Sequence, residues 1–174
     1  LTGRLDDIVL IDGVDGRKFT AAEFMDQVKR LAGGLTQAGH IQGKTVALMA
    51  PNSPDYCIIF HAVAWAGGTI TTLNPTYTPS EIQHQLKDSG AELLITIPAT
   101  LEAAQQAAAA LTGVEVCVIG AADGAPSLSQ YFGAAFQQQV PVNLDHHSVV
   151  LPYSSGTTGL PKGVCLSHRN LVMN

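Results

Sequence analysis

Charge is scarce in this sequence. Lys, Arg, Asp and Glu account for 13% of its 174 residues, whereas they make up about 25% of an average soluble chain. The 9 basic residues form no block or stripe and the formal net charge is −5, so nucleic acid is not expected as a partner. Hydrophobic residues reach 46%, which excludes an intrinsically disordered chain. We expect apolar surface to be exposed, and self-association across it.

The sequence also lacks paired cysteines and long apolar runs. Cys57, Cys117 and Cys165 are far apart and odd in number, which excludes a C-x-x-C motif and a disulfide framework. We expect buried, reduced thiols in a cytoplasmic protein. The most apolar stretch, residues 57–70, is shorter than the roughly 20 residues of a membrane-spanning helix. No signal peptide opens the chain and its first residue is Leu1, so we expect a piece of a longer polypeptide without a membrane span.

Short apolar strands alternate with capped helices along most of the chain. Runs that predict strands begin at residues 45, 69, 92 and 115, at intervals of 23 or 24 residues. Thr20, Ser53 and Thr78 have the features of helix N-caps, and proline follows the last two at the first helical position. Alternating strands and helices are typical of a parallel sheet with right-handed crossovers. The sequence therefore predicts an α/β fold, a mainly parallel sheet with flanking helices, in a single partial domain over residues 1–174.

The ends of the chain depart from this rhythm. Residues 7–11 and 17–20 predict a hairpin, and residues 127–136 a short helix. Residues 147–153 predict a further strand. We expect His146 and His147 at the entry to this strand, where adjacent side chains point to opposite faces and cannot share a metal ion.

Residues 153–164 are the segment whose composition most clearly indicates a binding site. They read Tyr-Ser-Ser-Gly-Thr-Thr-Gly-Leu-Pro-Lys-Gly-Val and begin at the end of a predicted strand. Glycines let the backbone turn its N–H groups toward one concavity, and hydroxyls add donors of adjustable direction. Lys162 supplies a compact cation. This combination predicts a site for a polyanion, most simply the phosphates of a nucleotide.

The spacing differs from that of two common nucleotide motifs. The phosphate loop G-x-x-x-x-G-K-[ST] places Ser or Thr after its lysine, but Gly163 follows Lys162 here. The dinucleotide fingerprint G-x-G-x-x-G is absent. Neither a phosphate-loop NTPase nor a dinucleotide-binding enzyme is therefore expected.

The same segment resembles the signature loop of the adenylate-forming, or AMP-binding, superfamily. That superfamily contains acyl- and aryl-CoA synthetases, peptide-synthetase adenylation domains and beetle luciferases. Residues 165–171, 19–24, 43–53 and 66–75 are also similar to family segments, so the resemblance covers nearly the whole chain. The form Ser-Ser-Gly-Thr-Thr-Gly-Leu-Pro-Lys-Gly looks closest to 4-coumarate–CoA ligases and their bacterial relatives.

This resemblance implies an ATP-dependent carboxylate–CoA ligase. A carboxylate attacks the α-phosphate of ATP to give an acyl-adenylate and pyrophosphate, and the thiol of coenzyme A then takes the acyl group. ATP, Mg²⁺, coenzyme A and a small carboxylic acid are the implied cofactors and substrates. The residues implied around the β- and γ-phosphates are Ser154, Ser155, Gly156, Thr157, Thr158 and Gly159, with Lys162 adding charge at the end of the loop.

Full-length members of the family are far longer than this chain. The resemblance therefore implies the first part of a large N-terminal domain, whose partner is the rest of its own polypeptide. The Mg²⁺-linked glutamate, the carboxylate pocket and the catalytic lysine would lie elsewhere, so we expect no catalytic residue or metal ligand in these 174 residues, and no turnover by them alone. Two interpretations stay open beside the ligase: an adenylating enzyme whose acceptor is a carrier-protein thiol or oxygen, and a non-catalytic module that binds nucleotide or a partner.

Other conspicuous side chains are assigned structural roles. His40, His61 and His84 are scattered and are not expected to bind a ligand. Trp65 is expected to pack in the core. His168 is expected to cap or pack at a helix start, with an approach to the nucleotide as the less favoured alternative.

Overall fold

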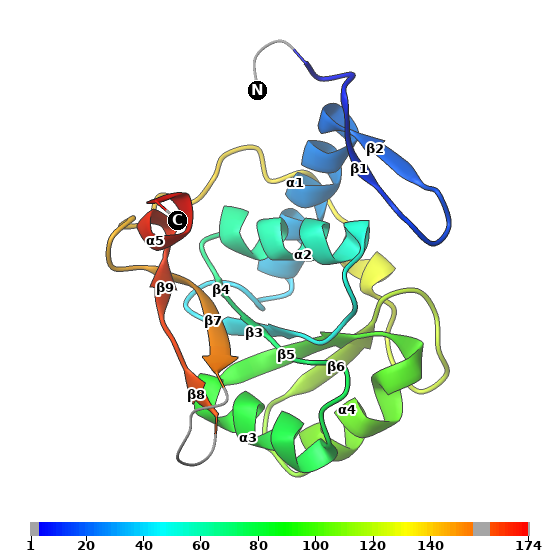
Figure 1. Cartoon of the computed structure of the whole chain (residues 1–174), viewed down its shortest axis with the longest axis vertical. Helices are drawn as coiled ribbons and strands as arrows, with labels where there is room; N and C mark the ends of the chain where they lie inside the picture. The colour runs from blue at the N-terminus through cyan, green and yellow to red at the C-terminus, as the bar shows by residue number, and fades with distance from the viewer. Residues whose placement is uncertain (1–3, 155–160, 174) are drawn as a thin grey trace.

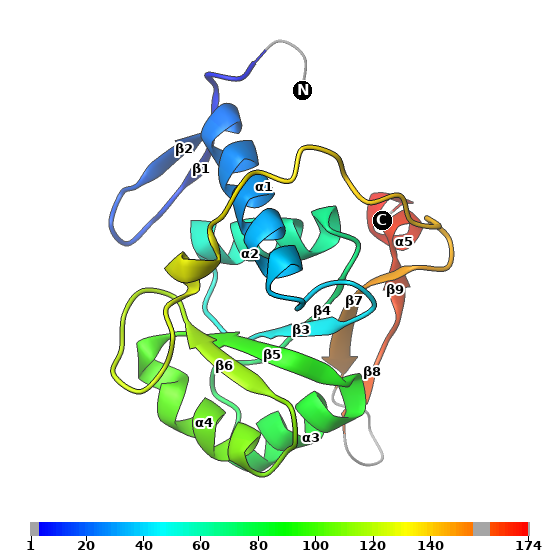
Figure 2. The ribbon, with the colours of Figure 1, turned by 180° about the vertical axis from the view of Figure 1, so that it is seen from behind.

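A central β-sheet organises the molecule (Figures 1 and 2). The computed structural model describes residues 4–154 and 161–173, and within them seven strands form the sheet. These are β3 (Thr45–Leu48), β4 (Thr69–Thr72), β5 (Ala91–Thr96), β6 (Glu115–Val118), β7 (Ser148–Ser154), β8 (Lys162–Gly163) and β9 (Leu166–Ser167). Their order is β6-β5-β3-β4-β7-β8, with β9 also paired to β7. Neighbours from β6 to β7 are parallel and only β8 and β9 pair antiparallel, which confirms the mainly parallel sheet.

Helices cover both faces of the sheet, as the alternating pattern predicts. Helices α1 (Ala21–Gln37) and α2 (Pro54–Trp65) lie on one face, and α3 (Pro79–Ser89) and α4 (Leu101–Ala109) lie on the other (Figures 1 and 2). The hairpin of β1 (Ile8–Ile11) and β2 (Lys18–Thr20) precedes α1. A short helix, α5 (His168–Met173), follows β9, and the 3₁₀ turn η1 (Pro98–Thr100) leads into α4.

Side-chain caps start three helices where the sequence predicts them. The Thr20 hydroxyl accepts the backbone N–H of Glu23, whose carboxylate accepts the N–H of Thr20 at 2.8 Å. Thr78 and Glu81 form the same capping box on α3. Ser53 accepts the N–H three residues further on in α2. Because an N-cap contributes about 1 kcal/mol, these contacts favour the observed helix starts before any core forms.

The strand β3 is buried on both faces. Val46 and Leu48 pack into the core beneath α1 and α2, whereas Ala47 and Met49 pack into the core on the side of α3 and α4. All four side chains are fully buried. A strand between two helical layers needs apolar residues at successive positions, which is why this run does not alternate.

The prediction of a helix over residues 127–136 is wrong. Only the 3₁₀ turn η2 (Leu128–Tyr131) forms, and the chain then crosses α1 and α2. The backbone N–H groups of Gly133 and Phe136 donate to carbonyls of α1, and the Phe136 carbonyl accepts the indole N–H of Trp65 at 2.8 Å. These groups therefore bond to α1 and α2 instead of within a helix of their own. The expected packing of Trp65 against the core is confirmed.

Two adjacent glycines allow this crossing. A Cβ atom on Gly34 would lie 1.6 Å from the carbonyl oxygen of Tyr131, and one on Gly33 would lie 2.0 Å from that of Ala134. Backbone therefore occupies the space of two side chains. Glycine in a helix interior costs up to about 1 kcal/mol, and here that cost permits close packing of the crossing segment.

His146 and His147 lie in the turn that leads directly into β7, where the carbonyl of Asn143 accepts both of their backbone N–H groups, so their expected position at the strand entry is confirmed. The expectation that the cysteines are buried needs correction. Of the three free cysteines, only Cys117 is buried, while Cys57 is half-buried and Cys165 is exposed. Burial, assisted by a nearby carboxylate, raises the pKa of the Cys117 thiol to about 12.

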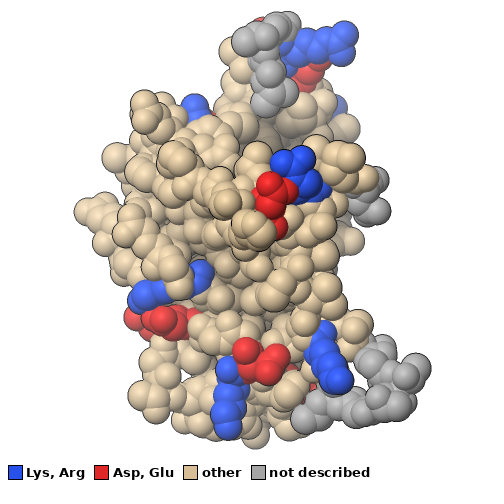
Figure 3. Space-filling view, turned by 90° about the vertical axis from the view of Figure 1, so that its left-hand side faces the viewer, with Lys and Arg blue, Asp and Glu red and all other residues tan. Residues whose placement is uncertain are grey.

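Apolar side chains are exposed near both ends of the chain. Those that are large and exposed are Leu5, Ile8, Val9, Ile11, Val14, Leu144, Val164, Leu171, Val172 and Met173. On the side that carries α5 and β9, uncharged residues cover most of the surface (Figure 3). Self-association across such surface stays a prediction. In the described part of the chain, the helices are too short or too polar to cross a membrane.

Candidate phosphate-binding loop

Two paired strands form the stem of the candidate loop, residues 154–162. Ser154, the last residue of β7, pairs with Lys162 at the start of β8, and Tyr153 pairs with Gly163. The pairing is antiparallel, so the chain leaves the sheet at Ser154 and returns to it at Lys162. Both side chains are exposed. The other predicted site residues lie outside the described residues, namely Ser155, Gly156, Thr157, Thr158 and Gly159.

The stem lies at the carboxyl end of β7, beside β4. Between β4 and its other neighbour, β3, the strand-to-helix connections change from one face of the sheet to the other. Helix α2, which follows β3, lies on one face, and α3, which follows β4, lies on the opposite face. In open α/β sheets, the crevice beyond the carboxyl ends of strands at such a switch point is where ligands bind. The fold therefore places the two ends of this segment, Ser154 and Lys162, next to the position that the topology favours for a ligand.

Tyr153 attaches the incoming strand of the stem to α3. Its hydroxyl donates to the Asp88 carboxylate at 2.5 Å. Partial burial, together with this hydrogen bond, raises the pKa of the Tyr153 hydroxyl, so the group stays a donor at neutral pH. A Cβ atom on Gly163 would lie 3.1 Å from two ring atoms of Tyr153. Gly163 thus leaves room for the ring that reaches Asp88.

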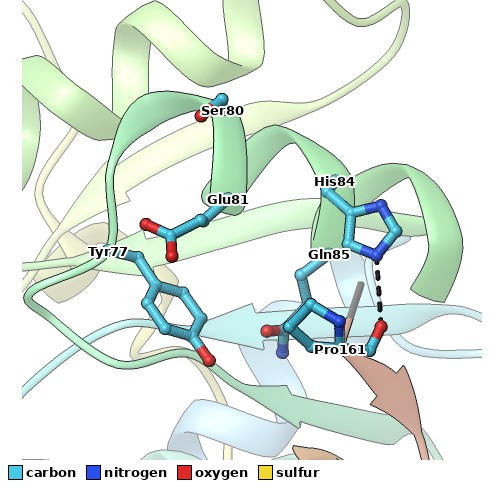
Figure 4. A pocket seen from close by; sticks show the side chains of 6 residues that line it. All are labelled: Tyr77, Ser80, Glu81, His84, Gln85 and Pro161. Atoms are coloured by element: carbon cyan, nitrogen blue, oxygen red, sulfur yellow. Dashed lines mark hydrogen bonds between the residues drawn. The ribbon is translucent and has the colours of Figure 1, made fainter. Parts of the chain in front are cut away.

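Pro161 attaches the outgoing strand to the same helix (Figure 4). The Nε2 atom of His84 lies 3.2 Å from the carbonyl oxygen of Pro161. A carbonyl oxygen only accepts, so the ring nitrogen is the donor and the Nε2-protonated form makes this bond. The pocket at this contact is lined by Tyr77, Ser80, Glu81, His84, Gln85 and Pro161. In Figure 4, His84 and Gln85 extend from α3 toward Pro161, and Tyr77 lies beside them.

Beneath the stem, a buried polar chain fixes α3 to the sheet. The side-chain N–H₂ of Gln85 donates to the Thr71 hydroxyl at 2.8 Å and to the Thr72 carbonyl at 3.0 Å. The Thr71 hydroxyl in turn donates to the Leu151 carbonyl of β7 at 2.8 Å. Gln85 is only 2% exposed and Thr71 is fully buried. Buried polar groups that satisfy one another fix a single relative position of the elements that carry them.

The remaining histidines do not form a metal site. His147 and His168 stack with their ring centroids 5.7 Å apart, and the Nε2 atom of His168 is buried without a hydrogen-bond partner. Burial, and then the neighbouring His147 ring, lower the pKa of His168. Within residues 4–154 and 161–173, no three His, Cys, Asp or Glu side chains are grouped so as to hold a metal ion.

No motif in the sequence marks His84, Asp88 or Gln85 as part of the site. His84 was expected to have no ligand role, and the structure places it against the stem. The partners of His84 and Asp88 lie 77 and 65 residues away along the chain. Only the order of strands around β4, which brings α3 beside β7, could have indicated these contacts.

A parallel α/β sheet, with a segment rich in glycines and hydroxyls following the carboxyl end of a strand in the sequence, is an arrangement found in the class of α/β proteins that bind nucleotides. Within that class, the chain belongs to the AMP-binding enzyme family, whose model matches residues 2–174. The resemblance seen in the sequence is thereby confirmed.

Known proteins of this family are similar in sequence and in structure. The chain is 39% identical to 4-coumarate–CoA ligase 5 of Oryza sativa subsp. japonica, over 99% of this chain and 32% of that protein. The luciferase-like enzyme of Zophobas morio superposes with a TM-score of 0.86 at 25% identity, over 94% of this chain and 40% of that one. MatB of Rhodopseudomonas palustris, solved with ATP bound, superposes with a TM-score of 0.81 at 28% identity, over 99% of this chain and 34% of that one. The chain thus spans about a third of the length of the curated relatives it matches.

Proposed function

We propose that this chain is the ATP-phosphate-binding part of an ATP-dependent carboxylate–CoA ligase. The observation that carries the proposal is the stem: its two strands, at the carboxyl end of β7, are joined in the sequence by a segment rich in glycines and hydroxyls, and Lys162 lies on its outgoing strand. The carboxyl ends of such strands are where ligands bind in open α/β sheets. The 39% sequence identity to a 4-coumarate–CoA ligase supports the acid–thiol ligase reaction. Similarity to a protein solved with ATP bound supports ATP as the substrate.

In the proposed reaction, the loop stabilises the leaving group. An oxygen of the substrate carboxylate attacks the α-phosphorus of ATP, and the bond from this phosphorus to pyrophosphate breaks. Pyrophosphate gains negative charge as it leaves, so fixed N–H and O–H donors stabilise the transition state more than the ground state. The donors proposed here are the backbone and hydroxyls of Ser154, Ser155, Gly156, Thr157, Thr158 and Gly159. The Lys162 ammonium adds a positive charge where the chain re-enters the sheet.

The second proposed step uses coenzyme A. Its thiol sulfur, after loss of the proton, attacks the acyl carbon of the adenylate, and AMP leaves as the thioester forms. We propose that the protein ligand of Mg²⁺ lies outside this chain, and we assign the ion no step here.

We further propose that residues 1–174 are one partial domain and that the rest of a longer polypeptide supplies the carboxylate pocket and the second half-reaction. The chain spans about a third of its relatives' length, which supports this division. The 174-residue chain should then release no pyrophosphate in response to a carboxylate. Carboxylate-dependent release by the chain alone would contradict the division. A different acceptor remains the second candidate function, supported by the luciferase-like structural neighbour.

The test is pyrophosphate release by the full-length polypeptide with aryl and fatty carboxylates, followed by addition of coenzyme A. We expect release that depends on a carboxylate, and a thioester once coenzyme A is present. Replacing Lys162 by Ala should lower kcat/KM for ATP by about 10- to 100-fold, because a hydrogen bond to a charged group contributes about 1.5–3 kcal/mol.

A lysine remote from the loop provides the control. Lys18 lies on β2, at the other end of the molecule from β8 (Figure 1). The Lys18→Ala variant should keep the wild-type kcat/KM. No pyrophosphate release with any acid would favour the non-catalytic module, and a carboxylate-dependent adenylate that never reaches coenzyme A would favour another acceptor.

A further inference from the structure

Helix α3 contacts both strands of the loop's stem. His84 bonds to the carbonyl of Pro161, just before β8, and Asp88 accepts the hydroxyl of Tyr153, near the end of β7. His84 and Asp88 are four residues apart, so they lie on the same face of the helix. One helical face therefore holds the chain where it enters the loop and where it leaves it.

These contacts are poorly explained as contributions to stability. Asp88 is exposed, and His84 and Tyr153 are only partly buried. Exposed polar contacts add little to the free energy of unfolding. The buried chain from Gln85 through Thr71 to Leu151 already fixes α3 relative to β7. The stem itself lies outside the part of the sheet whose position the core determines. The contacts of His84 and Asp88 therefore add a defined position for the stem.

Gly163 gives an independent sign that this arrangement is specific. Its pairing with Tyr153 would normally place two side chains next to each other on one face of the strands. With glycine at this position, the Tyr153 ring lies over the backbone of β8 and its hydroxyl reaches Asp88. The φ angle of Gly163 is not positive, so the glycine is required for space and not for backbone conformation.

We propose that His84 and Asp88 are positioning residues for the stem of the loop: they hold Pro161, at its outgoing strand, and Tyr153, at its incoming strand, on α3, and the fixed stem in turn favours binding of the phosphates of ATP. The inference rests on the proposed function, because it assumes that the loop binds these phosphates. Neither side chain is assigned a contact with ATP. Both act through the stem, and α3 thereby becomes part of the nucleotide site.

The experiment uses the full-length polypeptide and steady-state pyrophosphate release, with ATP, carboxylate and coenzyme A varied in turn. His84→Ala and Asp88→Ala should each raise the KM for ATP by about two- to tenfold, the range that corresponds to one hydrogen bond. The KM values for carboxylate and coenzyme A should stay within about twofold of wild type. Thermal midpoints should change by less than about 3 °C, because the contacts are exposed.

Conservative variants separate positioning from general damage. His84→Gln keeps an N–H donor for the Pro161 carbonyl and Asp88→Asn keeps an acceptor for Tyr153, so both should recover most of the ATP affinity. Tyr153→Phe removes the same hydrogen bond as Asp88→Ala, by deleting its donor, and should raise the KM for ATP by a similar factor. Gln83→Ala, on the same helix, should behave as wild type.

Several outcomes would overturn the inference. They are an unchanged KM for ATP in both alanine variants, equal losses in alanine and conservative variants, or losses that simply follow the thermal midpoint. If Lys162→Ala impairs ATP use and the α3 variants do not, the inference fails while the proposed function stands. If the wild-type polypeptide releases no pyrophosphate with any carboxylate, the proposed function fails and the inference fails with it.

Discussion

The buried polar chain beneath the stem leads to a stability prediction with a matched control. Thr71→Val keeps the shape of the side chain and removes one hydroxyl. That hydroxyl accepts from Gln85 at 2.8 Å and donates to the Leu151 carbonyl at 2.8 Å. The substitution leaves the buried side-chain amide of Gln85 and the carbonyl of the partly buried Leu151 with one partner fewer each.

The size of the effect follows from these two losses. A buried polar group without its partner costs about 1–3 kcal/mol. Gln85 keeps its second bond, to the Thr72 carbonyl, which limits the cost on that side. We therefore expect Thr71→Val to lower the free energy of unfolding by about 2–4 kcal/mol. For a domain of this size, about 2–4 °C per kcal/mol gives a fall of roughly 4–16 °C in the thermal midpoint.

Thr69 supplies the control on the same strand. Its hydroxyl also donates to a carbonyl of β7, that of Ser148 at 2.7 Å, but the residue is only partly buried. Thr69→Val should cost about 1 kcal/mol, because one bond is lost and water can replace it. Urea unfolding of the 174-residue chain, followed by the fluorescence of its single tryptophan, Trp65, measures both variants. Equal losses in the two variants, or a loss below about 1 kcal/mol for Thr71→Val, would refute this account of the network.

Three further predictions concern other contacts. Gly34→Ala should cost about 3 kcal/mol or more in urea unfolding, because its Cβ would lie 1.6 Å from a carbonyl oxygen, whereas Gly13→Ala, with nothing within 4 Å, should cost less than about 0.5 kcal/mol. Gly163→Ala should raise the KM for ATP, because its Cβ would displace the Tyr153 ring, and this rise should shrink in a Tyr153→Phe background. Burial lowers the pKa of His168 and so favours its neutral form in the folded state. Its contribution to stability should therefore be present above about pH 6.5 and be lost as the pH falls from there toward the folded-state pKa, and His168→Gln should flatten this dependence in pH-resolved unfolding.

The local elements were largely predictable from sequence, because their determinants are close together along the chain. Capping at Thr20, Ser53 and Thr78 involves only residues within three positions. The strand starts predicted at residues 45, 69 and 115 agree with the structure. The strand expected to start at residue 92 is β5, which begins one residue earlier, at Ala91. Short-range hydrogen bonds and periodic burial determine such features before long-range contacts contribute.

The sequence-based predictions fail where contacts between distant parts of the chain override the local secondary-structure preference. Residues 127–136 have a helical pattern, but their backbone groups bond to α1 and α2 across the glycines 33 and 34. Of the candidate site, the sequence indicated the loop but not α3, because strand order decides which helix lies beside β7. His84 carries no motif that distinguishes it from His40 or His61 in the sequence.

The placement of the ATP phosphates on the loop is tested most directly by amide NMR of the 174-residue chain. Pyrophosphate is added in one titration and adenosine in another. With pyrophosphate we predict chemical-shift changes at the backbone amides of residues 154–160, 162 and 163, and smaller changes at those of residues 84–88 of α3. With adenosine we predict little change at these positions. Pyrophosphate shifts located elsewhere in the molecule, or absent from the loop at saturating concentration, would contradict the assignment of the loop as the phosphate site.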